Sequence, residues 1–130
     1  MNFLVGYDGS NSAKEALTLA IKHALAFKAS ITIVTSMETG TLEEAGQIKA
    51  AKKELEYAEA SAKDQGIQAD AHLLIRGMKP GEDLVKFARE SNSETIFIGV
   101  KRRSKVGKLL FGSNAQYIIL KAPCPVMTVR

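Results

Sequence analysis

Two segments of the sequence combine glycine with polar side chains at positions where a strand is expected to end. Tyr7-Asp8-Gly9-Ser10 follows a short apolar run, and Gly99-Val100-Lys101 closes another. Glycine lets a ligand approach the main chain closely. The carboxylate of Asp8 accepts hydrogen bonds from donors such as an exocyclic amine or a ribose hydroxyl. These residue types predict a site for the donor groups of a small polar ligand.

A basic cluster and a helix start follow the second glycine segment. The net charge of the chain is +4, and its cations gather at Lys101, Arg102, Arg103, Lys105 and Lys108. Such a local excess predicts an anionic partner. Gly112-Ser113-Asn114 then opens an expected helix, whose free amide N–H groups and dipole attract anions. Ser113 adds a hydroxyl donor. One segment therefore suits a base or sugar, and the other suits phosphates.

Each segment also has a purely structural interpretation. Asp8-Gly9-Ser10 is typical of a turn with a helix cap. Gly112-Ser113 is typical of an ordinary helix N-terminus, and a run of cations is typical of a solvated loop. In a doubly wound sheet, however, ligands bind outside the carboxyl ends of neighbouring strands. The joint placement of the segments therefore favours a binding site.

Apolar patterning predicts five strands that alternate with four helices. The expected strands cover 3–5, 31–35, 71–75, 95–99 and 125–129, and the expected helices cover 13–25, 41–63, 80–88 and 112–120. Ser12 and Glu15 have the spacing of a capping box and would start the first helix. This order favours a doubly wound α/β fold in a single domain, residues 1–130. Its five-stranded sheet would be mostly parallel, with helices on both faces.

Composition limits the setting in which the chain works. Its 130 residues with 45% hydrophobic and 25% charged content are ordinary for one globular domain. Cys124 is the single cysteine, which is typical of a reducing compartment. The N-terminus lacks the pattern of a signal peptide, and no apolar run approaches the ~20 residues of a membrane span. We therefore expect a cytoplasmic protein that does not use a membrane.

Catalysis has little support in the sequence. His23 lies off the apolar stripe of the first helix and is expected to be exposed, and His72 lies in a strand remote from the predicted site. Cys124 stands between two prolines and is expected to serve packing. No Ser-His-Asp order, metal-ligand spacing or Walker lysine is present. The sequence favours a binding protein, with slow hydrolysis of a bound ligand through Asp8 left open.

Three motifs, in order and spacing, resemble those of the universal stress protein family over the whole chain. Asp8-Gly9-Ser10 is similar to the end of that family's first strand, and Gly77-Met78-Lys79-Pro80 resembles its turn after the third strand. Ala122-Pro123-Cys124-Pro125-Val126 is similar to its approach to the last strand. The resemblance implies the strand order 3-2-1-4-5, in which Asp8 faces Gly99.

ATP-binding members of this family carry Gly-x-x-Gly, nine residues, and then Gly-Ser or Gly-Thr. Here Gly99 and Gly112-Ser113 keep that spacing, but Arg102 replaces the second glycine. Arginine there either fills the space beside a phosphate or grips the phosphate with its guanidinium. The resemblance implies ATP as the ligand, with Mg²⁺, or else AMP or cyclic AMP. Tyr7, Asp8 and Ser36 would line the adenine and ribose end, and Gly99, Lys101, Arg102, Arg103, Gly112, Ser113 and Asn114 would surround the phosphates.

The resemblance also implies a homodimer formed through the last strand, Val126 to Val129. The favoured hypothesis for the mechanism is a stress-response switch, in which nucleotide orders the segment from Lys101 to Phe111 and alters a surface that a protein partner reads. The alternative is a nucleotide-independent dimeric interaction module that uses the basic Lys101–Lys108 segment. Nucleic acid is the less favoured partner, because Phe111 is the only aromatic residue beside those cations.

Overall fold

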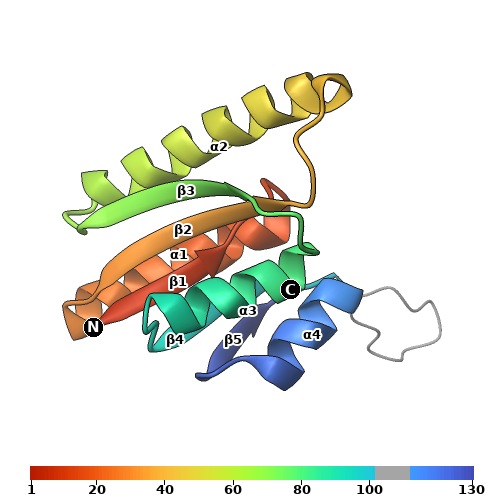
Figure 1. The fold of residues 1–130 in the computed structure, drawn as a ribbon. Helices are drawn as coiled ribbons and strands as arrows, with labels where there is room; N and C mark the ends of the chain where they lie inside the picture. Colours follow the sequence, from red (N-terminus) through yellow and green to blue (C-terminus); the bar gives the residue numbers. More distant parts are fainter. Residues whose placement is uncertain (102–111) are drawn as a thin grey trace.

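Strands and α-helices alternate along the chain in the computed structural model, which describes residues 1–101 and 112–130 (Figure 1). The strands are β1 (Asn2–Gly6), β2 (Ser30–Met37), β3 (Ala69–Ile75), β4 (Thr95–Gly99) and β5 (Val126–Val129). The helices are α1 (Asn11–Phe27), α2 (Ala45–Asp64), α3 (Pro80–Glu90) and α4 (Ser113–Lys121). The predicted order of elements is confirmed.

The strands form one sheet in the order β3-β2-β1-β4-β5. Every neighbouring pair is parallel, and the central strand β1 pairs with β2 from Asn2 opposite Ser30 and with β4 from Phe3 opposite Thr95. The chain moves outward from β1 to β3 on one side and from β4 to β5 on the other. The predicted doubly wound order 3-2-1-4-5 is therefore confirmed, and its reversal lies between β1 and β4.

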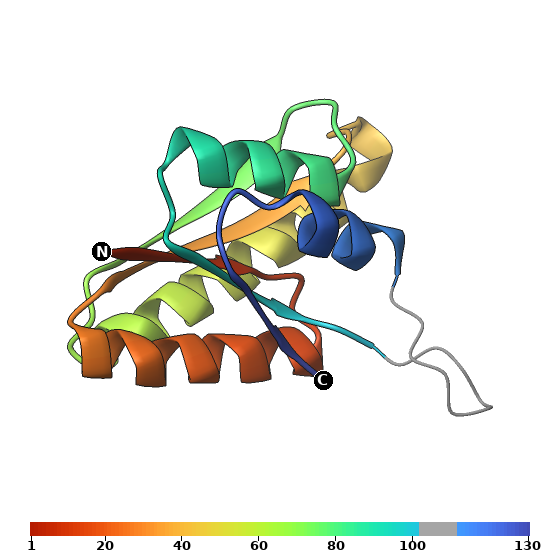
Figure 2. The ribbon, with the colours of Figure 1, turned by 90° about the horizontal axis from the view of Figure 1, so that it is seen from below.

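Helices cover both faces of the sheet, as Figure 2 shows. Because side chains alternate along a strand, neighbouring residues enter different layers. Val5 and Phe97 pack in the cluster that α1 and α2 cover, whereas Leu4 and Ile98 pack in the cluster that α3 and α4 cover. We call these the α1/α2 face and the α3/α4 face.

The start of α1 differs from the prediction. Its N-cap is Ser10, whose Oγ accepts a hydrogen bond from the N–H of Ala13 at 3.2 Å. Gly9 supplies the positive φ of 79° in the turn before it, a conformation that favours glycine. Ser12 already lies inside the helix, with its hydroxyl 3.2 Å from that of Ser10. The predicted capping box at Ser12 and Glu15 is therefore wrong, because the turn ends two residues earlier.

The long second helix also begins later than predicted. Residues Leu42–Glu44 form a 3-10 turn, and α2 starts at Ala45. The Glu44 carboxylate accepts hydrogen bonds from the hydroxyls of Thr39 and Thr41 at 2.6 and 2.9 Å. These bonds lower the pKa of Glu44 below its ordinary value. A capping box is thus present here, at Thr41 and Glu44.

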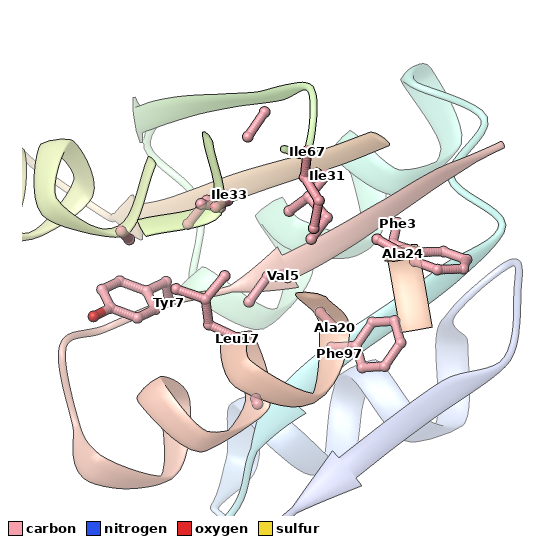
Figure 3. Close-up of a cluster of buried hydrophobic side chains, with 14 of the residues drawn as sticks. Phe3, Val5, Tyr7, Leu17, Ala20, Ala24, Ile31, Ile33, Ile67 and Phe97 are labelled. Atoms are coloured by element: carbon pink, nitrogen blue, oxygen red, sulfur yellow. The ribbon is translucent and has the colours of Figure 1, made fainter. Parts of the chain in front are cut away.

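The α1/α2 face holds a closely packed apolar cluster, part of which Figure 3 shows. The rings of Phe3 and Phe97 lie 5.4 Å apart, and His23 contacts Phe97 edge-on with ring centroids 5.5 Å apart. His23 is therefore half-buried rather than exposed as predicted. The reason is that its imidazole ring packs against the buried ring of Phe97.

Candidate functional site

A cavity of about 230 Å³ opens at the carboxyl ends of β1, β2 and β4, beside the strand reversal. Val34, Leu84, Ile98 and Ile118 give it an apolar floor. Its remaining lining residues come from strand ends and helix starts, namely Gly6, Tyr7, Asp8, Ala13, Ser36, Pro80, Gly81, Gly99, Asn114 and Ala115. An apolar pocket with a few polar groups at this place in the fold is the usual form of a ligand site.

Two helix N-termini meet at one side of this cavity. The Gly81 N–H of α3 donates to Oδ1 of Asn114 in α4 at 2.9 Å. A Cβ at Gly81 would lie 2.8 Å from the main-chain oxygen of Asn114, so only glycine fits. In α3, Pro80 has no N–H group and the Gly81 N–H is bonded to Asn114. The first amide groups of α4 are free of helical partners, and both helix dipoles are positive at this end. This side of the cavity therefore favours an anion.

The Asn114 side chain is partly committed to this junction. Its oxygen accepts the hydrogen bond from Gly81, so only its NH₂ group has donors to offer a ligand.

The other residues predicted to surround phosphates do not all border the cavity. Gly112 is the N-cap of α4, and Ser113 is its first residue and is exposed. Neither lines the cavity. Lys101 is exposed and lies in a separate shallow groove with Arg130 and the start of α1. Arg102 and Arg103 lie outside the described residues.

Asp8 stands at the end of β1 with an exposed carboxylate that borders the cavity. Its Oδ1 accepts a hydrogen bond from the Ser10 N–H at 2.9 Å, which closes the turn into α1. The other carboxylate oxygen keeps its acceptor capacity for a ligand donor. Asp8 therefore combines the two interpretations of its motif, as a turn residue and as an acceptor at the cavity.

Tyr7 borders the cavity, but its side chain lies on the opposite face of the sheet. It belongs to the apolar cluster under α1 and α2 and is 4% exposed (Figure 3). Burial raises the pKa of Tyr7, and the nearby charges of Glu54, Tyr57 and Asp8 add to the effect. Strand alternation places Val5 and Tyr7 on one face and Gly6 on the other. We infer that Tyr7 offers only its main chain to a ligand.

The two strand-end glycines have structural reasons that the sequence did not reveal. A Cβ at Gly99 would lie 2.6 Å from the nitrogen of Ala13, inside the α1 main chain. Gly99 is thus required for the contact of α1 with β4. A Cβ at Gly6 would point toward the cavity side, 3.0 Å from Leu84 and 3.1 Å from Ile98. Close helix packing, rather than ligand approach, explains glycine at position 99.

Sequence reasoning missed a buried polar network next to the cavity. Asp83 of α3 is fully buried and pairs with Arg76 at 2.5 Å. The Ser36 hydroxyl donates to the other Asp83 oxygen at 2.7 Å. Desolvation opposes the charge of Arg76, but hydrogen bonds to Glu90 and Asp83 outweigh it and raise its pKa. One feature of the sequence could have indicated burial of Asp83: it directly precedes the apolar residues Leu84, Val85 and Ala88 of the same helix.

The other titratable candidates lie away from the cavity. His72 on β3 contacts the Asp70 carboxylate at 2.8 Å, on the edge of the sheet. Cys124 is half-buried, and burial raises the pKa of its thiol. Over residues 1–101 and 112–130, no three His, Cys, Asp or Glu side chains gather as a metal site would require. In the same ranges, none of the helices has the length and apolar character to cross a membrane.

A family model and a relative match the sequence over nearly its whole length. The family model described as "Universal stress protein family" matches residues 1–130. A Thermus aquaticus protein described as "Universal stress protein in QAH/OAS sulfhydrylase 3'region" is 33% identical over 133 aligned residues, which are 98% of this chain and 96% of that protein.

Solved structures agree with the match. A universal stress protein from Archaeoglobus fulgidus superposes with a TM-score of 0.90 and 35% identity, covering 100% of this chain and 98% of that one. A structure described as the A. fulgidus universal stress protein in complex with dAMP has a TM-score of 0.84 and 32% identity, with the same coverage. Sequence motifs, strand order and these likenesses lead to one conclusion: this chain belongs to the universal stress protein family.

Proposed function

We propose that this protein binds an adenine nucleotide in the cavity at the carboxyl ends of β1, β2 and β4. One observation carries the proposal: a carboxylate acceptor, Asp8, and two converging helix N-termini border the same apolar-floored cavity. A base needs apolar walls, a ribose needs acceptors, and a phosphate needs N–H donors. The dAMP complex of the A. fulgidus relative supports the same ligand class.

The order of groups along the sheet gives the ligand an orientation. The base would lie over Val34 and Leu84 near β2, and the ribose would lie near Asp8 on β1. The α-phosphate would sit at the junction of Gly81 and Asn114. The described cavity is smaller than the roughly 300–1,000 Å³ of typical ligand sites. Further phosphates of ATP would extend toward residues 102–111, which lie outside the described part of the chain.

Among nucleotides, ATP remains our proposal, with AMP and cyclic AMP as the alternatives to be distinguished. Asp8 is the one carboxylate that lines the described cavity. Mg²⁺ is commonly held by one or two carboxylates together with substrate phosphates. A magnesium ion that enters with ATP would be held by the phosphates, because the free oxygen of Asp8 is assigned to the ribose.

Calorimetric titration of the protein with ATP, AMP and cyclic AMP tests the proposal. Asp8→Asn keeps the size of the side chain and its turn-forming oxygen but removes the charge, and we expect about tenfold weaker binding. Asp70→Asn is the matched control, because Asp70 is also exposed but lies at the start of β3 and does not line the cavity. The proposal fails if the unmodified protein binds none of the three. Binding gained only in Arg102→Gly would instead favour the nucleotide-independent interaction module.

The switch hypothesis concerns the segment from Lys101 to Phe111, most of which lies outside the described residues. Limited proteolysis with and without saturating nucleotide tests it directly. We expect slower cleavage within this segment when nucleotide is bound. Unchanged cleavage rates would remove the switch hypothesis and leave the binding proposal intact.

A homodimer through β5 is a further proposal, supported by the position of β5 at the edge of the sheet. The N–H groups of Ile96 and Val100 donate to the carbonyls of Pro125 and Val129, so the main-chain groups of these two residues face β4. Because main-chain groups alternate in direction along a strand, the N–H of Thr128 points away from β4. Thr128→Pro would remove that edge donor without removing a bond to β4, and Thr128→Ala is its control. Sedimentation should show dissociation only in the proline variant; equal dimerisation of both variants would contradict pairing at β5.

A further inference from the structure

We propose that Ser36, held by the buried Asp83–Arg76 pair, is a specificity-determining residue that accepts a hydrogen bond from the 6-amino group of the bound base. This inference rests on the proposed function and deepens it. The Ser36 hydroxyl would recognise the edge of the base as an acceptor, because its own proton is donated to Asp83.

The network has a defined geometry. Asp83 is 0% exposed, yet both of its carboxylate oxygens have partners. Oδ1 accepts from Nε of Arg76 at 2.6 Å, and Oδ2 accepts from the Ser36 hydroxyl at 2.7 Å. Arg76 is held in turn by Glu90 at 2.8 Å and by the Phe87 ring beneath its guanidinium. The arrangement fixes the rotamers of both Asp83 and Ser36.

The direction of the hydrogen bond decides what Ser36 can offer. A carboxylate has no proton to donate, so the Ser36 proton lies on the bond to Asp83. The remaining lone pairs of Ser36 Oγ can only accept. Donation to a charged group also polarises the hydroxyl and strengthens it as an acceptor. Because Ser36 lines the cavity, it favours a ligand group that carries N–H or O–H.

Position identifies that ligand group. Along the edge of the sheet the order is β2, β1, β4, so Ser36 lies at one end of the cavity and the start of α4 at the other. Phosphates at the helix junction place the ribose near Asp8 and the base near Ser36. The amino group at position 6 is the donor on the base edge of adenine. A base without that group would leave the Ser36 acceptor unsatisfied.

A comparison on the same strand separates this role from a merely structural one. Thr32 lies on the same face of β2, four residues before Ser36, and its hydroxyl donates to Asp70 at 3.0 Å. That pair is at the opposite end of the strand from the cavity, and Thr32 does not line it. Thr32→Val therefore removes a similar hydroxyl–carboxylate bond without touching the proposed recognition site.

The test compares AMP with purine riboside 5′-monophosphate, which lacks only the amino group. Calorimetry on the unmodified protein should show about tenfold tighter binding of AMP, the cost of one lost hydrogen bond. Ser36→Ala should bind the two ligands equally, while Thr32→Val should keep the tenfold ratio. Asp83→Asn should also reduce the ratio, and circular dichroism confirms that each variant is folded. If Asp83→Asn does not fold, the result for Ser36→Ala decides.

The outcomes distinguish this inference from the proposed function. Equal binding of both ligands by the unmodified protein would overturn the role of Ser36 and leave nucleotide binding intact. A tenfold ratio that survives Ser36→Ala would do the same, because another residue would then read the amino group. Failure of AMP itself to bind would overturn the proposed function, and the inference with it.

Discussion

Ile33 and Val34 are neighbours on β2, but their side chains enter different surroundings. Ile33 is fully buried in the apolar cluster beneath α1 and α2, where alanines let the helices lie close to the sheet. Val34 borders a cavity on the α3/α4 face, next to a buried carboxylate and two helix N-termini. One face is closely packed, and the other holds a cavity bordered by polar groups.

This difference shows how a small domain can carry a site without losing its fold. A cavity removes dispersion contacts from the residues that line it, and a buried ion pair is a weak source of stability. Both features lie on the α3/α4 face, whereas the α1/α2 face holds the Phe3–Phe97 contact. We expect the packed face to supply most of the free energy of unfolding.

Matched isoleucine truncations test the comparison with the largest expected effect. Ile33 is 0% and Ile98 is 5% exposed, and both lie in central strands. We expect Ile33→Ala to cost about 4–5 kcal/mol and Ile98→Ala, which borders the cavity, about 2–3 kcal/mol. Urea unfolding measures both values. Equal losses would mean that the two faces are packed alike.

A methyl group added at each strand-end glycine gives the next largest effect. Gly99→Ala should cost about 1–3 kcal/mol, because the neighbouring atoms are α1 main chain that cannot move aside. Gly6→Ala should cost about 1 kcal/mol or less, because the Leu84 and Ile98 side chains can shift into the cavity. Gly6→Ala should instead weaken AMP binding, as measured by calorimetry. A reversed order of stability losses would contradict the roles assigned to the two glycines.

The smallest expected effect concerns Tyr7. Its main chain borders the cavity, but its side chain lies on the α1/α2 face. Its pKa is raised above the ordinary value of 10.0. As the pH rises past that value, the unfolded chain loses the Tyr7 proton first, so the folded state loses stability until its own pKa is reached. Tyr7→Phe removes this part of the alkaline loss.

Urea unfolding of Tyr7→Phe and of the unmodified protein at pH 7 and about pH 10.5 measures this difference, because the ordinary tyrosine pKa of about 10 separates the two conditions. We also expect Tyr7→Phe to leave AMP binding unchanged, since the hydroxyl does not face the cavity. Weaker AMP binding in this variant would show that the side chain reaches the ligand after all.

Much of the fold could be predicted from the sequence, because element order and apolar periodicity limit the topology. The turn at Pro80 and the helix start at Gly112-Ser113 lie at the expected positions. The exact start of α1 could not be predicted, since Ser10 and Ser12 are both good capping residues. The turn with positive φ at Gly9 and the bond from the Ala13 N–H to Ser10 decide between them.

The candidate site was predictable in its location but not in its details. Asp8, Ser36 and Asn114 line the cavity; strand-end reasoning gave Asp8, the expected helix start gave Asn114, and only the family resemblance implied Ser36. That reasoning cannot tell which side-chain atoms other parts of the protein already use, as Gly81 uses the Asn114 oxygen. Nor can it find Asp83, because an acidic residue in the first turn of a helix is ordinarily explained by the helix dipole.

The helix α4 connects the two proposed interaction sites of this protein. Ala115 and Ile118 line the cavity, and the chain leaves the other end of α4 for the edge strand β5. If a bound nucleotide shifts α4 and thereby changes how strongly two copies associate, thermodynamic linkage fixes the reverse effect. Association of the copies must then change nucleotide affinity by the same factor, so the protein's own concentration would set its sensitivity to nucleotide.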